Sequence, residues 1–60
     1  MKIKMLSTMI DEEFDIEVWH EDDIYTVTDQ CDDYYIIKEI MGQPYGVNKD
    51  CCGQMFIEVE

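Results

Sequence analysis

The chain has 60 residues, 47% of them hydrophobic, and its 15 acidic residues against four lysines give a formal net charge of −11. This length limits it to one domain, residues 1–60, with a small core, and the apolar content is too high for a disordered acidic tail. The charge excludes direct binding to nucleic acid, because neutralising phosphates requires a basic patch.

Two strands are predicted in the first third of the chain. Residues 2–6 are predicted to form the first strand. In residues 11–19 the apolar side chains of Phe14, Ile16 and Val18 alternate with carboxylates, which is the pattern of a half-buried strand. We therefore expect residues 11–19 to be extended, with the apolar side facing the core and the acidic side facing outward.

The middle of the chain predicts a hairpin and a second turn. Residues 24–28 and 34–37 are rich in β-branched and aromatic side chains, and the polar residues 29–33 between them suit a hairpin loop. Residues 42–44, Gly-Gln-Pro, indicate the next turn, which leads into a strand at residues 45–47.

The last third predicts a short 3-10 turn and a final strand. Residues 48–53 are turn-prone and end at Gly53, and residues 55–59 are typical of a strand. No segment has a convincing helical stripe. The expected fold is all-β: a small five-stranded antiparallel barrel with a short 3-10 turn before the last strand, because closure hides the sheet edges of so small a chain.

Four segments resemble the SH3-like barrels of small bacteriophage and prophage proteins. They are Tyr25-Thr26-Val27, Asp32 to Ile37, Gly42 to Lys49 and Phe56 to Val59. The resemblance spans residues 24–60 and the first strand. The chain departs from the usual pattern at Asp22-Asp23-Ile24, where a Gly-Lys pair commonly precedes the Tyr-x-Val strand. The resemblance implies the barrel, but it implies little about function, because such barrels have many unrelated roles.

The residues that could support catalysis or metal binding are few. Cys31, Cys51 and Cys52 are an odd number, so we expect reduced thiols rather than disulfides. With His20 they could supply four zinc ligands, but adjacent cysteines are poorly placed to coordinate one ion together. For calcium, no segment has the ligand order of an EF-hand loop. We expect no cofactor, no metal site and no enzymatic activity.

The charge is concentrated in residues 11–33, which contain eleven carboxylates and no Lys or Arg, while the rest of the chain balances four acids against four lysines. If residues 11–19 are extended, alternate carboxylates form a row with a step of about 6.8 Å, similar to the spacing of phosphates along one nucleic-acid strand. Trp19, at the end of this row, would add an aromatic contact. The predicted partner-binding residues are Asp11, Glu13, Asp15, Glu17, Trp19, Glu21, Asp22, Asp23, Asp32 and Asp33.

This row predicts a nucleic-acid mimic that binds and blocks the basic groove of a host nucleic-acid-binding protein. The phage resemblance fits this class, since small phage proteins that resemble DNA include inhibitors of CRISPR nucleases, of uracil-DNA glycosylase and of restriction enzymes. The alternative is a generic SH3-like protein-interaction module without mimicry. The N-terminal segment is neither a secretory h-region nor a membrane span, so we expect a protein of the host cytoplasm with no membrane partner. An unpaired edge strand would support a two-fold homodimer.

Overall fold

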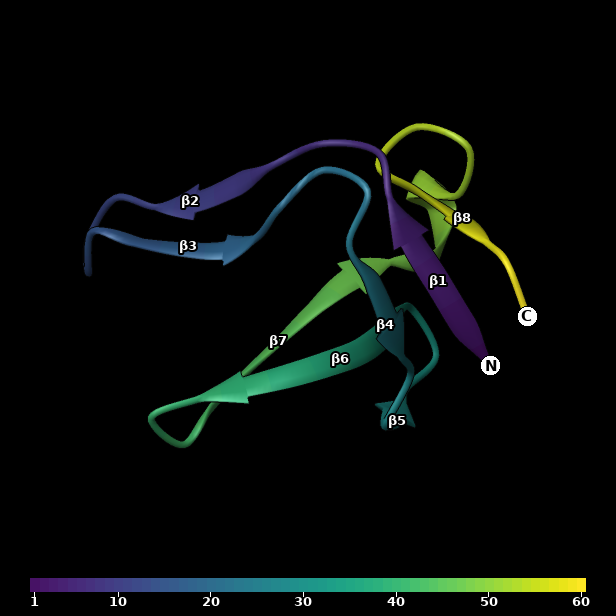
Figure 1. The fold of residues 1–60 in the computed structure, drawn as a ribbon. Helices are drawn as coiled ribbons and strands as arrows, with labels where there is room; N and C mark the ends of the chain where they lie inside the picture. Colours follow the sequence, from purple (N-terminus) through teal and green to yellow (C-terminus); the bar gives the residue numbers. More distant parts are fainter.

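The computed structural model describes residues 1–60 as an all-β protein, in which every pairing between strands is antiparallel. Figure 1 shows the order of the elements. The strands are β1 (Lys2–Met5), β2 (Met9–Asp11), β3 (Ile16–Trp19), β4 (Ile24–Thr26), β5 (Asp29–Gln30), β6 (Tyr34–Ile40), β7 (Gln43–Asn48) and β8 (Phe56–Glu58). The 3-10 helix η1 (Lys49–Cys51) precedes β8. The predicted all-β class and the 3-10 turn before the last strand are confirmed.

The strands form three separate sheets, with the orders β4-β1-β8, β2-β3 and β5-β6-β7. No continuous ladder closes them into a barrel, so the closed five-stranded barrel is not found. The chain passes between the two larger sheets at Val27 and Thr28. The amide of Val27 donates to the carbonyl of Met1 (2.9 Å), whereas the amide of Thr28 donates to the carbonyl of Ile36 (2.9 Å). The predicted strand 24–28 therefore ends at this switch, and the predicted loop 29–33 is wrong at its start, because Asp29–Gln30 form β5, which pairs with β6 while β4 pairs with β1.

The long hairpin of β6 and β7 turns over Met41 and Gly42, whose φ angles are 51° and 77°. Two consecutive positive φ angles are typical of a type I′ turn, which matches the twist of the flanking strands. The turn comes earlier than the predicted 42–44, because Gln43 already pairs with Ile40. Further along β7, Gly46 is required by close packing: a Cβ atom there would lie 2.3 Å from the carbonyl oxygen of Tyr35.

The core lies between these sheets and consists of seven apolar side chains with exposed fractions of 0 to 4%. They are Ile3, Met5, Val18, Trp19, Ile37, Val47 and Phe56. In β1 the buried Ile3 and Met5 alternate with lysines, as the period of a half-buried strand requires. The Phe56 ring meets Tyr35 edge-on, with ring centres 6.1 Å apart, and so joins β8 to β6.

The predicted strand over residues 11–19 is wrong, because the chain reverses direction inside it. β2 ends at Asp11, residues 12–15 form a turn, and β3 begins at Ile16. The carboxylate of Asp11 accepts a hydrogen bond from the amide of Glu13 (3.0 Å), and Asp15 has a φ of 54°. Asp favours such turns because its side chain bonds the backbone nearby and tolerates the left-handed region. Figure 1 shows the resulting β2–β3 hairpin extending away from the other strands.

Candidate interaction surface

The β2–β3 hairpin carries the largest group of carboxylates. We call residues 9–19 the acidic hairpin. It contains no lysine or arginine. Its acidic residues are Asp11, Glu12, Glu13, Asp15 and Glu17. The proposed row with alternate carboxylates on one side of a strand does not form, since Glu13 and Asp15 lie in the turn rather than in an extended segment. These groups are still brought together, but by the hairpin.

The acidic hairpin is almost uncompensated by cations. The one ion pair within its reach joins Glu17 Oε1 to His20 Nδ1 at 3.0 Å, and it requires a protonated imidazole. The remaining four carboxylates make no ion pair. Since like charges in one hairpin repel, this arrangement costs folding free energy in the isolated protein.

Tyr45 in β7 ties the hairpin to the rest of the molecule. Its hydroxyl donates a hydrogen bond to Asp11 Oδ2 at 2.9 Å. This bond to a carboxylate, together with partial burial, raises the pKa of Tyr45 above its ordinary value of 10.0. The contact fixes the end of β2, from which the acidic turn projects.

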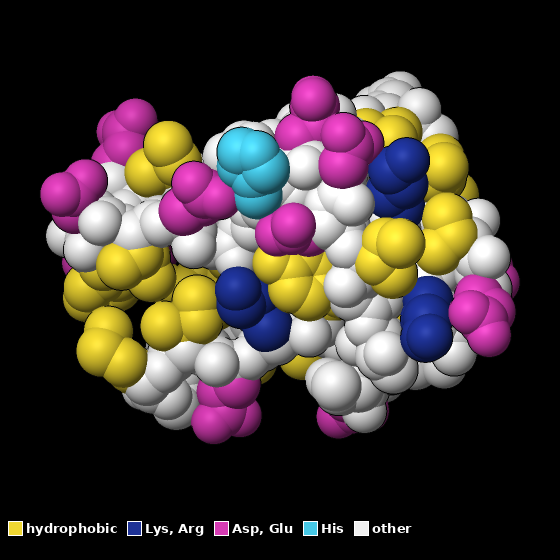
Figure 2. All heavy atoms as spheres, viewed as in Figure 1, with side chains coloured by type: hydrophobic (Ala, Val, Ile, Leu, Met, Phe, Trp, Pro, Cys, Tyr) yellow, Lys and Arg dark blue, Asp and Glu magenta, His cyan; other side chains and the backbone are white.

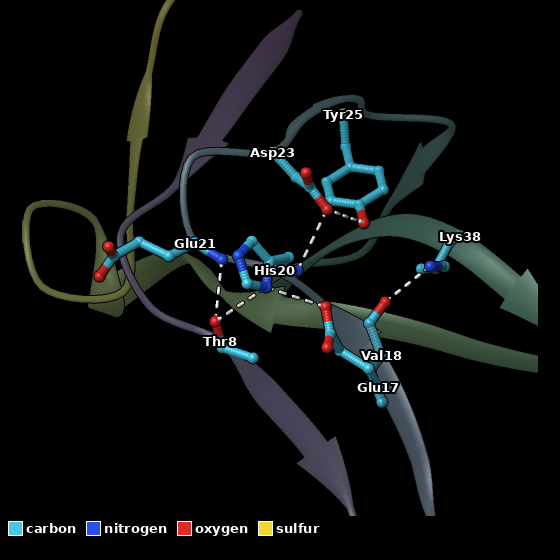
Figure 3. A network of polar contacts seen from close by, with 8 residues as sticks. All are labelled: Thr8, Glu17, Val18, His20, Glu21, Asp23, Tyr25 and Lys38. Carbon is cyan, nitrogen blue, oxygen red and sulfur yellow. Dashed lines mark hydrogen bonds and ion pairs between the residues drawn. The ribbon is translucent and has the colours of Figure 1, made fainter.

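The loop after the hairpin, residues 20–23, contains three more acidic residues, and Figure 3 shows Glu21 and Asp23 in their contacts. Asp23 Oδ2 accepts hydrogen bonds from the amide of His20 (3.1 Å) and from the hydroxyl of Tyr25 (3.1 Å). Burial, and then the bond to Asp23, raises the pKa of Tyr25. Asp22 Oδ1 lies 3.7 Å from Lys4 Nζ. This exposed pair makes a small contribution to stability, on the order of 0 to 1 kcal/mol.

Thr8 and Lys38 hold this loop and the end of β3 in place. The hydroxyl of Thr8 accepts a hydrogen bond from the amide of Glu21 (3.0 Å) and lies 3.5 Å from His20 Nδ1. Lys38 Nζ donates to the carbonyl of Val18 (2.6 Å) and lies 5.2 Å from the centre of the Tyr25 ring. Figure 3 shows the Thr8 contacts beside His20 and the bond from Lys38 to Val18. Lys38 thus donates a hydrogen bond to a backbone carbonyl and makes a cation–π contact with an aromatic ring, and it pairs with no carboxylate of the hairpin.

The other predicted acidic cluster is separate. Asp32 and Asp33 lie in the turn between β5 and β6, and in Figure 1 this turn is on the opposite side of the molecule from the acidic hairpin. The nearby Lys49 Nζ donates to Gln30 Oε1 (3.0 Å) and lies 5.0 Å from the centre of the Tyr35 ring. The predicted partner-binding residues therefore divide between two surfaces rather than forming one.

Trp19 was predicted to lie at the end of the acidic row and to contact a partner there. This predicted outward position is wrong. Its side chain is 2% exposed and belongs to the core, and its indole N–H has no hydrogen-bond partner. An unpartnered buried donor costs on the order of 1 to 3 kcal/mol. The residue is buried because β3 enters the core at its C-terminal end, where Val18 is also fully buried.

The acidic hairpin also exposes apolar side chains, including that of Phe14, which was predicted to face the core. Phe14 is 53% exposed at the turn of the acidic hairpin, and Ile10 in β2 is 57% exposed. Met9, at the start of β2, is 37% exposed. Figure 2 shows hydrophobic side chains between acidic ones over this hairpin. The sequence offered one usable signal, the Asp residues at positions 11 and 15 that favour a turn.

The structure and the comparisons give three further findings. The three cysteines are free, and no three His, Cys, Asp or Glu side chains are grouped to hold a metal ion. No helix is long and apolar enough to cross a membrane. No family model, curated protein or solved structure matches this chain.

Proposed function

We propose that the protein is an acidic inhibitor that binds the basic nucleic-acid-binding groove of a host protein through the acidic hairpin. The observation that carries this proposal is the projecting hairpin with five carboxylates and no lysine, of which only Glu17 has a basic side chain, His20, within ion-pair distance. Such a surface repels itself in the free protein. It is stabilised when it meets lysines and arginines of a partner.

The net charge and the carboxylates outside the hairpin also favour binding to a basic partner. A net charge of −11 exceeds the magnitude of about 2 to 8 that keeps a small domain soluble, so solubility alone does not account for it. The loop carboxylates of Glu21 and Asp23 make no ion pair and extend the acidic surface from the root of the hairpin. A basic groove attracts this surface at long range, which makes association fast and sensitive to salt.

The fold assignment that goes with this proposal is an SH3-like arrangement. Two observations support it. The segment of β4 and β5 acts as one bent strand that contributes to both larger sheets, with the switch at Val27 and Thr28. In addition, η1 directly precedes β8, which returns to pair with β1. Small phage proteins of this type supply the class of inhibitor we propose, acting in the host cytoplasm without enzymatic activity.

A second candidate is a generic SH3-like interaction module in which aromatic contacts dominate and charge is secondary. Tyr34 favours it, since this large aromatic side chain on β6 is 46% exposed. The two candidates differ in the residues they require. Tyr34→Ala weakens partner binding in the module and leaves it unchanged in the inhibitor.

The test is competition for host proteins held on immobilised duplex DNA. The protein is added at constant ionic strength, and released host proteins are recovered in complex with it. We compare two double variants with the same change in charge: Glu12→Lys with Glu13→Lys in the acidic hairpin, and Asp32→Lys with Asp33→Lys in the distant turn. Both pairs have exposed side chains.

We expect the hairpin variant to lose release by about tenfold or more and the distant variant to retain most of it. Release by the unaltered protein should fall steeply between about 50 and 200 mM salt. The proposal is rejected if the hairpin variant, shown to be folded by thermal melting, releases host proteins as well as the unaltered protein. Equal losses in both variants would also reject it, because they would reflect net charge alone.

A further inference from the structure

The acidic hairpin exposes three large apolar side chains, and charge mimicry gives them no role. Ile10, Phe14 and Met9 are 57%, 53% and 37% exposed. Scattered single apolar side chains on a surface are ordinary, but here three are exposed within residues 9–14 of one projecting hairpin, and such a concentration is typical of interaction sites.

None of these three side chains belongs to the core. The hairpin is attached at its root by the buried Val18 and Trp19, and near the end of β2 by the hydrogen bond from Tyr45 to Asp11. Phe14 lies beyond these attachments, in the turn itself.

The apolar and acidic side chains are interleaved. Ile10 lies directly opposite Glu17 in the β2–β3 ladder, so the two share one face of the hairpin. Phe14 stands between Glu13 and Asp15 in the turn. A partner that reaches the carboxylates therefore also meets the apolar side chains.

We infer that the acidic hairpin recognises a basic protein surface that contains an apolar pocket, rather than positive charge alone. This inference rests on the proposed function and narrows its partner class. Charge complementarity selects the occupant, because the hairpin has five carboxylates and no cation of its own. The apolar side chains then discriminate among basic grooves, since those without a pocket leave Ile10 and Phe14 exposed to water.

The experiment measures binding of the full chain to two synthetic peptides of equal length and charge. One alternates lysine with leucine, and the other alternates lysine with serine. We expect the lysine–leucine peptide to bind more tightly by about tenfold, which is the effect of burying one or two large apolar groups. The double variant Ile10→Ser with Phe14→Ser should remove this difference and leave the affinity for the lysine–serine peptide unchanged.

Ile24→Ser is the matched control, because Ile24 is 59% exposed but lies on β4, outside the acidic hairpin. It should keep the tenfold difference. The inference is overturned if the two peptides bind equally, or if Ile24→Ser removes the difference as fully as the hairpin variant. The proposed function fails separately, if Glu12→Lys with Glu13→Lys does not weaken binding of the lysine–serine peptide.

Discussion

The acidic hairpin and the rest of the molecule differ in how their charged side chains are paired. Outside the hairpin, all four lysines hold contacts: Lys2 with Glu60, Lys4 with Asp22, Lys38 with a carbonyl and Lys49 with an amide. Inside it, four of five carboxylates have no ion pair. The two sheets β4-β1-β8 and β5-β6-β7 are thus stabilised by internal contacts of their lysines, whereas the charges of the hairpin stay largely unpaired.

The same contrast appears along the single strand β3. Ile16 at its start is half-buried, Glu17 is exposed, and Val18 and Trp19 at its end are buried. The strand is anchored at one end and presents a turn at the other. Strong anchoring lets the hairpin bear repulsive charge without unfolding the molecule, and the following predictions test this division.

The largest difference is expected between two phenylalanines. Phe56 is fully buried, so Phe56→Ala should lower the free energy of unfolding by about 3 to 5 kcal/mol. Phe14 is 53% exposed in the hairpin turn, and Phe14→Ala should change it by no more than about 0.5 kcal/mol. Urea titration followed by the fluorescence of the buried Trp19 measures both. Similar losses in the two variants would show that the hairpin turn is part of the core.

Salt should have a smaller and opposite effect. Screening the unpaired carboxylates should raise the stability between about 10 and 500 mM salt by about 1 kcal/mol, or about 4 to 8 °C in melting temperature for a domain of this size. The triple variant Glu12→Gln, Glu13→Gln and Asp15→Asn should show a smaller rise in melting temperature with salt. Asn is chosen at position 15 because it tolerates the positive φ there. A melting temperature that falls with salt would mean that the exposed lysine pairs outweigh the repulsion.

The smallest effect concerns the bond between Tyr45 and Asp11. Tyr45→Phe removes the donor, so amide exchange in β2 and β3 should accelerate while β6 stays protected. Tyr34→Phe is the control, because the Tyr34 hydroxyl makes no such bond. Unchanged exchange in Tyr45→Phe would show that the root alone positions the hairpin.

The same bond predicts that the attachment of the hairpin weakens at alkaline pH. The folded state raises the pKa of Tyr45 above 10.0. The bond therefore contributes fully to folded-state stability below pH 10.0, and this contribution is lost as the pH rises through the pKa of Tyr45 in the folded protein. The methyl resonance of Ile16, which pairs with Asp11, should shift over this range in the unaltered protein. In Tyr45→Phe this shift should be absent or much reduced.

Much of the fold follows from local pattern. The strands at residues 34–37 and 45–47, the 3-10 turn and the final strand were each predicted near their observed positions. Their residues combine β-branched or aromatic composition with Gly at the turns, and these local preferences agree with the tertiary arrangement. The errors concentrate in residues 11–19, where an alternating pattern also fits a hairpin whose turn contains Phe14.

The charge asymmetry, the all-β class and the absence of Lys and Arg from residues 11–33 could all be predicted before the structure, because they depend on composition and on a period of two. The tertiary structure alone decided which side chains meet water. Period two places Phe14 inside and Trp19 outside, but the reversal at residues 12–15 exposes Phe14, and the entry of β3 into the core buries Trp19. Residues 16–18 keep their predicted alternation, so the errors lie in the turn and at the end of β3, where an irregular register and long-range packing bury Val18 and Trp19 together.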